Sequence, residues 1–220
     1  FQNQFRAAMM LYPRTGLPQS LTDPDSAEKF TELVSTLFPV LVNQQNENSL
    51  TFLEWGYQTM KATQNWIAMY PMVHGISAKL VDLKDNQALK WIDRLEKLIP
   101  KIPEIKKGST DIDQRIKVVE ANVHIFKGMY FLDSQLDKSI RHFEQVEALL
   151  EEISLDVISS SNREFYLNNI KIAYLTIAGK LKNEAFELKR QKQFDEALQR
   201  YQAACDYAER AQSGSDIIQM

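Results

Sequence analysis

The sequence predicts an all-α protein with about eight helices in antiparallel pairs. The 220-residue chain holds seven Gly and seven Pro, too few for the many tight turns of an all-β fold. Apolar residues recur at spacings of three and four over long stretches, as on helices with one buried face. No stretch of useful length alternates apolar and polar residues in the manner of a half-buried strand.

The first 25 residues are predicted to form an arm or linker. Pro and Gly residues concentrate there, at Pro13, Gly16, Pro18 and Pro24. The opening segment FQNQFRAAMML has neither a long apolar region nor a cleavage-like site, so no signal peptide is expected.

Residues 26–70 are predicted to form an N-terminal helical hairpin that packs on the rest of the chain. The Asp–Pro pair at residues 23–24 suits the first turn of a helix, and the polar segment 43–48 separates this helix from the next. Residues 51–54 have the spacing of a capping box. Pro71 is expected to end the second helix, because proline interrupts helical hydrogen bonding.

Residues 71–211 are predicted to form three further hairpins, followed by a tail at 212–220. Two prolines and a glycine predict a break at 100–110. Capping patterns at 134–137 and 161–164 predict the starts of two later helices. The middle hairpin depends on apolar residues that step by three and four: Ile116, Val119, Val123, Phe126 and Tyr130.

The last hairpin is expected to pair a long helix, residues 163–190, with the stretch QFDEALQRYQAACDYAER at 193–210. At 1.5 Å per residue the long helix measures about 42 Å. Small residues recur in the second helix at Ala197, Ala204 and Ala208. Such residues let two helix axes approach closely, so the long helix is their expected counterpart.

A small residue followed four and seven positions later by apolar ones recurs in three helices. The three sets are Ala88, Ile92 and Leu95, then Ser139, Phe143 and Val146, then Ala197, Tyr201 and Ala204. QFDEALQRYQAA resembles the second half of a tetratricopeptide repeat, and Pro100 stands where that family commonly has a closing proline. The resemblance covers about residues 71–211. It implies elongated, divergent hairpins stacked as a superhelix similar to that family's, or as a right-handed helical array; a generic helical bundle is the alternative.

The resemblance also implies where a ligand would bind, because that family uses a concave groove lined by the first helix of each repeat. The corresponding residues here are His74, Ala78, Val81, His124, Gly128, Phe131, Lys182, Phe186, Lys189 and Arg190. Two histidines and a lysine among them would suit an acidic or phosphorylated peptide, more strongly below a pH of about 6.5. The alternative is that these histidines lie on helix surfaces and share no role. The family's carboxylate-clamp residues are missing, which argues against recognition of chaperone tails.

No motif for catalysis, a cofactor or a metal is found. The chain has no glycine-rich phosphate loop and no zinc-finger spacing. Glu120 and His124 lie four residues apart and could supply two metal ligands, but two ligands do not make a site, and a plain surface pair is the favoured interpretation. A net charge of −3 argues against nucleic-acid binding, and no apolar run reaches the length of a membrane span.

Cys205 is the sole cysteine, so an intramolecular disulfide is impossible and a reducing, cytoplasmic location is expected. The sequence therefore predicts a non-enzymatic interaction module, an adaptor or scaffold that binds a peptide or partner helix in a helical-repeat groove. The alternative is an all-helical regulatory or structural domain of a larger assembly, with the arm packed on the chain or a neighbour. An all-α enzyme has no motif to support it.

Overall fold

The computed structural model confirms the all-α class. It describes residues 24–44, 47–107, 111–154, 156–158 and 160–213, and within these ranges the chain forms helices and turns but no strand. The chain divides into an N-terminal unit, Phe1–Ile112, and a C-terminal unit, Asp113–Met220. Nearly all of the predicted arm at 1–25 and tail at 212–220 lies outside the described residues.

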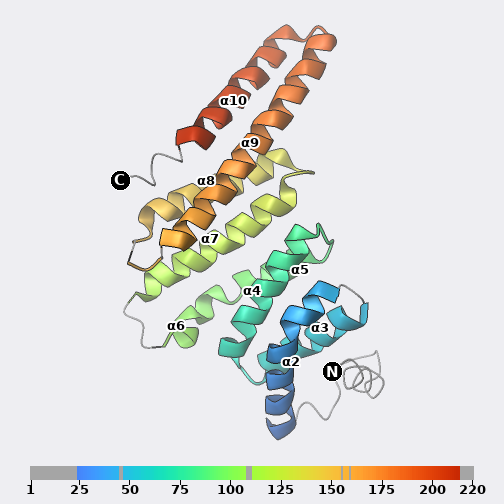
Figure 1. Cartoon of the computed structure of the whole chain (residues 1–220), viewed down its shortest axis with the longest axis vertical. Coiled ribbons are helices and arrows are strands. Elements are labelled where there is room, and N and C mark those ends of the chain that lie inside the picture. Colours follow the sequence, from blue (N-terminus) through green and yellow to red (C-terminus); the bar gives the residue numbers. More distant parts are fainter. Residues whose placement is uncertain (1–23, 45–46, 108–110, 155, 159, 214–220) are drawn as a thin grey trace. The chain divides into compact units, whose positions relative to one another are not determined.

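The N-terminal unit contains α2 to α6 (Figure 1). Helix α2 packs against α3 and α4, and α4 packs against α5 and α6. The predicted break at 100–110 contains two short helical segments, and Pro100 and Pro103 lie in their first turns, where proline is tolerated. The elements are α2 (Pro24–Gln44), α3 (Glu47–Ala62), α4 (Trp66–Asp82), α5 (Ala88–Glu96), a 3₁₀ turn (Ile99–Lys101) and α6 (Ile102–Ile105).

Two predictions about the second and third helices are wrong. The capping pattern at 51–54 lies inside α3, which begins at Glu47, and Pro71 lies inside α4 instead of ending α3. The chain turns earlier, at Gln64, whose φ is 54°. Asn65 then caps α4 by accepting a hydrogen bond from the Ala68 amide at 3.1 Å. The predicted boundary between residues 70 and 71 therefore falls within α4.

Three helix ends share one turn geometry without glycine. Gln64, Lys84 and Lys192 have φ values of 54°, 53° and 64°, in the left-handed region that glycine usually occupies at the end of a helix. In the last turn the Gln193 amide donates to the Leu188 carbonyl at 3.0 Å, and the Lys192 amide donates to Lys189 at 3.0 Å. These bonds satisfy carbonyls at the helix end, and the same pattern follows α3 and α4.

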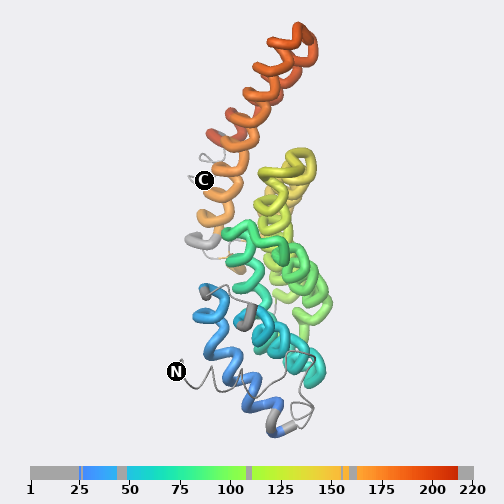
Figure 2. Tube along the Cα trace, turned by 90° about the vertical axis from the view of Figure 1, so that its right-hand side faces the viewer, coloured from blue at the N-terminus to red at the C-terminus, as the bar shows by residue number. Residues whose placement is uncertain are grey.

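The C-terminal unit consists of two antiparallel hairpins, as the sequence predicts. Helix α7 (Ile112–Phe131) pairs with α8 (Leu136–Glu152), and α9 (Ser160–Arg190) pairs with α10 (Phe194–Ser213). Figure 2 shows α9 and α10 side by side, as Figure 1 does. Packed helix pairs of this kind are compatible with a helical repeat.

The capping predictions in this unit are displaced. Helix α8 begins after Gln135, whose side chain makes no capping bond, and α9 begins at Ser160, so that Ser161 lies inside the helix. The packing prediction for α10 is confirmed. Ala197 and Ala204 are buried, and α10 packs extensively along α9.

Glycines in α3, α4 and α7 mark places where helices nearly touch. A Cβ on Gly128 would lie 2.9 Å from the Phe143 ring of α8. In the N-terminal unit, a Cβ on Gly56 would lie 2.5 Å from Val34, and one on Gly75 would lie 2.9 Å from Phe38. A Cβ at these positions would require the neighbouring side chain to shift.

Candidate interaction surface on the last hairpin

The residues of the predicted groove divide between the two units and differ in exposure. His74, Ala78 and Val81 belong to the N-terminal unit, and the other seven belong to the C-terminal unit. Val81 and Gly128 are buried and offer no accessible surface. Half-buried residues are His74, Ala78, His124 and Phe131, whereas the exposed ones, all on α9, are Lys182, Phe186, Lys189 and Arg190.

His124 has a role within its own hairpin. Its Nδ1 lies 2.9 Å from Nδ1 of His142 on α8, and the Phe131 ring stacks over His142 with centroids 6.0 Å apart. One nitrogen must donate and the other accept, so this bond requires that at least one ring is neutral. His142 is not among the residues that the sequence pattern singles out. Among the described residues, no group of three or more His, Cys, Asp or Glu is arranged to hold a metal ion.

Helix α9 is apolar on two opposite faces. The inner face carries Tyr174, Ile177, Leu181 and Ala185, all buried. Since a helix turns about 100° per residue, a second apolar set lies on the opposite side. We call it the outer stripe: Phe165, Ile172, Leu175 and Phe186, each between 48% and 58% exposed.

Charge borders the outer stripe along one side. The same helical geometry places Lys171, Lys182 and Lys189 along this border, with Glu164 at its N-terminal end. On the other border lie Asn169, Thr176 and Asn183, with Glu187, which pairs with Arg190 at 3.2 Å, at its C-terminal end. Lys180 points elsewhere, toward the turn that follows α7, where its Nζ lies 3.1 Å from Asp133. The outer stripe is therefore apolar with one mainly basic edge.

Helix α10 carries further exposed apolar residues, separated from the outer stripe by its lysine edge. Phe194 and Leu198 are 63% and 58% exposed, and Cys205 is also exposed. These three residues share one face of α10, roughly opposite Arg210, which contacts α8. The outer stripe likewise lies opposite the residues of α9 that contact α7. The exposed apolar residues of both helices thus occupy the side of the hairpin that faces away from α7 and α8.

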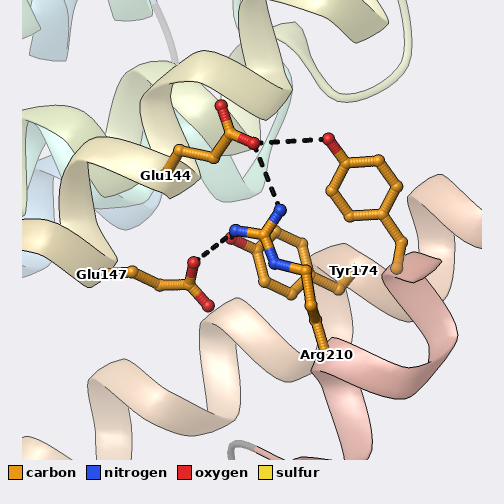
Figure 3. Close-up of polar contacts among 5 residues, drawn as sticks. Glu144, Glu147, Tyr174 and Arg210 are labelled. Atoms are coloured by element: carbon orange, nitrogen blue, oxygen red, sulfur yellow. Dashed lines mark hydrogen bonds and ion pairs between the residues drawn. The ribbon is translucent and has the colours of Figure 1, made fainter. Parts of the chain in front are cut away.

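A polar network fastens this hairpin to α8 (Figure 3). Arg210 donates to Glu144 at 3.2 Å, to Glu147, and to the Tyr174 hydroxyl at 2.8 Å. Tyr207 donates to Glu144 at 3.4 Å. The guanidinium also lies over both tyrosine rings, 4.6 Å from the Tyr174 centroid and 5.2 Å from the Tyr207 centroid, in a cation–π arrangement.

The network keeps fixed charges rather than exchanging protons. Burial, together with the neighbouring Glu147 carboxylate, raises the pKa of Tyr174 far above its usual value. Burial by itself lowers the pKa of Arg210, but bonds to Glu147 and Glu144 outweigh it and raise that pKa. A neutral phenol and a charged guanidinium therefore persist across the physiological pH range. The network orients α10 and holds the outer stripe in place.

Two hollows lie near the hairpin. One, of about 150 Å³, is lined by residues of α8, α9 and α10, including Leu150, Leu167 and Ile170; typical small-molecule sites are larger. The other, about 640 Å³, is an open depression near the α9–α10 turn, lined by Glu184, Glu187 and other polar residues. Neither collects a nucleophile and a base as a catalytic site would.

Comparisons with known proteins do not identify a family. No protein-family model, curated protein or solved structure matches the chain. The likeness to tetratricopeptide repeats therefore depends on the residues named above and on the helical pairs. In the part of the chain that the structure describes, no helix combines the length and apolar character needed to cross a membrane.

Proposed function

We propose that the chain is a protein–protein interaction module that binds an acidic amphipathic helix on the outer side of its α9–α10 hairpin. The observation that supports this is the outer stripe, four large apolar side chains held half exposed on one helix face. Surfaces of this kind, with a polar border, are typical of binding sites for partner helices.

The size of the surface suggests weak to moderate affinity. Complete burial of a large apolar side chain contributes roughly 1.5–3 kcal/mol, so each half-exposed residue offers about 1 kcal/mol. The outer stripe with Phe194 and Leu198 thus gives roughly 6 kcal/mol before the cost of association. Favourable charge pairs must add to this sum, and we expect a dissociation constant of about 10–100 μM for a single helix.

Charge determines which partner fits. Three lysines and Glu164 lie on one border of the outer stripe, and Glu187 lies on the other. A glutamate-rich helix therefore places opposite charges along the lysine edge. A second copy of the chain, packed with the same edge facing its own, would bring lysines together. The lysine and phenylalanine residues predicted for the groove on α9, Lys182, Lys189 and Phe186, all belong to this surface, whereas the buried Val81 and Gly128 do not.

A synthetic peptide provides the test. The probe is a helical peptide with one leucine stripe flanked by glutamates, and its controls are a scrambled peptide and one in which lysines replace the glutamates. Fluorescence anisotropy should show micromolar binding of the acidic peptide alone. Substituting Ile172→Ser together with Phe186→Ser should weaken binding at least tenfold, whereas Ile67→Ser, at an apolar residue of α4 that is 67% exposed, should not.

The edge charges are tested by reversal. Lys182→Glu with Lys189→Glu should shift the preference from the acidic to the basic peptide, because it inverts the charge of the edge. The proposal is wrong if the acidic and basic peptides bind the unaltered chain with equal affinity. It is also wrong if the substitutions at Ile172 and Phe186 leave the affinity for the acidic peptide unchanged.

A further inference from the structure

Gly179 occupies a place for which the fold itself gives no reason. It lies near the middle of the 31-residue helix α9, and a Cβ built there meets no atom within 4 Å. A glycine inside a helix costs about 1 kcal/mol relative to alanine. Nothing in the described chain offsets this cost.

Elsewhere in the described helices, glycine accompanies close packing. Gly56, Gly75 and Gly128 each lie so near a side chain of another helix that a Cβ would come within 2.5–2.9 Å of it. Gly179 differs from these three because no side chain of another helix lies near the position that its Cβ would occupy. The close approach of a partner helix would account for this difference.

The position of Gly179 agrees with that inference. It lies seven residues after Ile172 and seven before Phe186, so it shares the outer stripe with them. Two contacts across the hairpin, Glu184–Arg200 and Arg210–Tyr174, set a register in which Gly179 and Cys205 lie at the same level. Both are exposed, Gly179 on the outer stripe of α9 and Cys205 on the solvent-facing side of α10.

We infer that Gly179 is the crossing point at which the backbone of the acidic partner helix comes closest to α9. This inference rests on the proposed function and adds the geometry of docking. Without a side chain at 179, the two axes can approach to about 8 Å, the short end of the usual range. Large residues on either side, Leu175 and Phe186, then flank the partner helix.

A helix explains this glycine better than a lipid surface does. A partner helix that crosses α9 contacts it over a short length, so the absence of one side chain at the crossing point lets the two helices pack more closely. A membrane surface gains from every added apolar group along the helix. Replacing Gly179 by leucine should therefore weaken helix binding and strengthen membrane binding.

The decisive variants are Gly179→Ala and Gly179→Leu. The open space around Gly179 means that both should fold, and both should raise the thermal midpoint, because they improve helix propensity. Gly179→Leu should nevertheless weaken binding of the acidic peptide at least tenfold, and Gly179→Ala by a smaller factor. Gln199→Leu adds the same side chain at an exposed position of α10 that is turned away from Leu198 and Cys205, and it should leave affinity unchanged.

Cys205 supplies an independent readout. It is exposed and is the only cysteine, so its rate of maleimide labelling reports access to the level of Gly179. Saturating acidic peptide should slow this rate severalfold in the unaltered chain. The peptide with lysines in place of glutamates should not slow it.

Each contrary result has a distinct meaning. If Gly179→Leu binds the peptide normally while Ile172→Ser with Phe186→Ser does not, the crossing point is wrong and the proposed function stands. If stripe and glycine variants all bind normally, both are wrong. Stronger binding of Gly179→Leu to phosphatidylserine-containing vesicles, without peptide binding, would assign the surface to lipid. Concentration-dependent dimerisation abolished by Gly179→Leu would replace the acidic partner by a second copy, and each of these two results overturns the inference.

Discussion

Glu54 should make the N-terminal unit sensitive to acid. Its Oε2 lies 2.9 Å from Lys90 Nζ, its Oε1 accepts from Gln58 at 2.9 Å and from Arg94, and the Arg94 guanidinium lies 3.9 Å from the Tyr57 ring centroid. Partial burial tends to raise the pKa of Glu54, but the bonds from Arg94, Lys90 and Gln58 outweigh it and hold the pKa at about 2, below its usual 4.5.

The sign and size of the effect follow from this pKa. A carboxyl whose folded-state pKa is lowered stabilises the fold above its unfolded pKa, and loses that contribution as the pH falls from about 4.5 toward 2. At about 1.4 kcal/mol per pH unit, the limit is about 3.4 kcal/mol. Glu54 is 28% exposed, so solvent screening reduces this to about 2 kcal/mol.

Glu54→Gln therefore should lower the free energy of unfolding by about 2 kcal/mol at pH 7 and by less than about 1 kcal/mol at pH 3. Urea titrations followed by tryptophan fluorescence isolate the effect, because all three tryptophans lie in the N-terminal unit. Glu104→Gln is the matched control, since this glutamate pairs with Lys101 but is 54% exposed, and it should change little. A loss of unfolding free energy in Glu54→Gln that is the same at pH 7 and pH 3 would refute the reasoning.

Three further changes test the packing. Arg210→Ala should lower the free energy of unfolding by about 2 kcal/mol, measured by urea unfolding followed by circular dichroism. The loss is smaller than for a fully buried ion pair because Arg210 is 36% exposed. Arg210→Lys should recover only part of this stability, because lysine lacks the planar guanidinium group, and full recovery would contradict the bonding described. Gly128→Ala should destabilise by about 1 kcal/mol, as the clash with the fully buried Phe143 exceeds the gain in helix propensity; a raised thermal midpoint would show that the ring yields. Lys192→Gly should stabilise by about 0.5–1 kcal/mol, since glycine adopts a positive φ without strain; a loss of stability in the same denaturation assay would mean that the lysine side chain matters.

The sequence predicts helices well and their ends poorly, for a physical reason. Periodic apolar residues define the buried face of a helix, and they identified α7 and the α9–α10 pair. Helix ends depend on a few backbone hydrogen bonds. Here Gln64 adopts a left-handed conformation that a glutamine in the sequence does not predict. Pro71 is the stronger stop signal in the sequence, but it lies inside α4.

The sequence predicts only some of the residues of the candidate surface. Lys182, Phe186 and Lys189 were selected through a family resemblance, and the structure leaves all three exposed. The same resemblance selected Gly128, whose small size serves the contact with Phe143 instead. Ile172 and Leu175 escaped notice because a helix with two apolar faces gives no periodicity that separates the inner from the outer one.

The Arg210 network also has a consequence for the order of folding. The α9–α10 hairpin grows from a short local turn at Lys192, whereas the bond from Arg210 to Glu144 spans 66 residues of chain, whose closure costs more conformational entropy. We therefore expect the hairpin to form early and the network to close after the rate-limiting step. In stopped-flow experiments, Arg210→Ala should accelerate unfolding and leave the folding rate nearly unchanged. A folding rate that falls in proportion to stability would place the network in the folding nucleus instead.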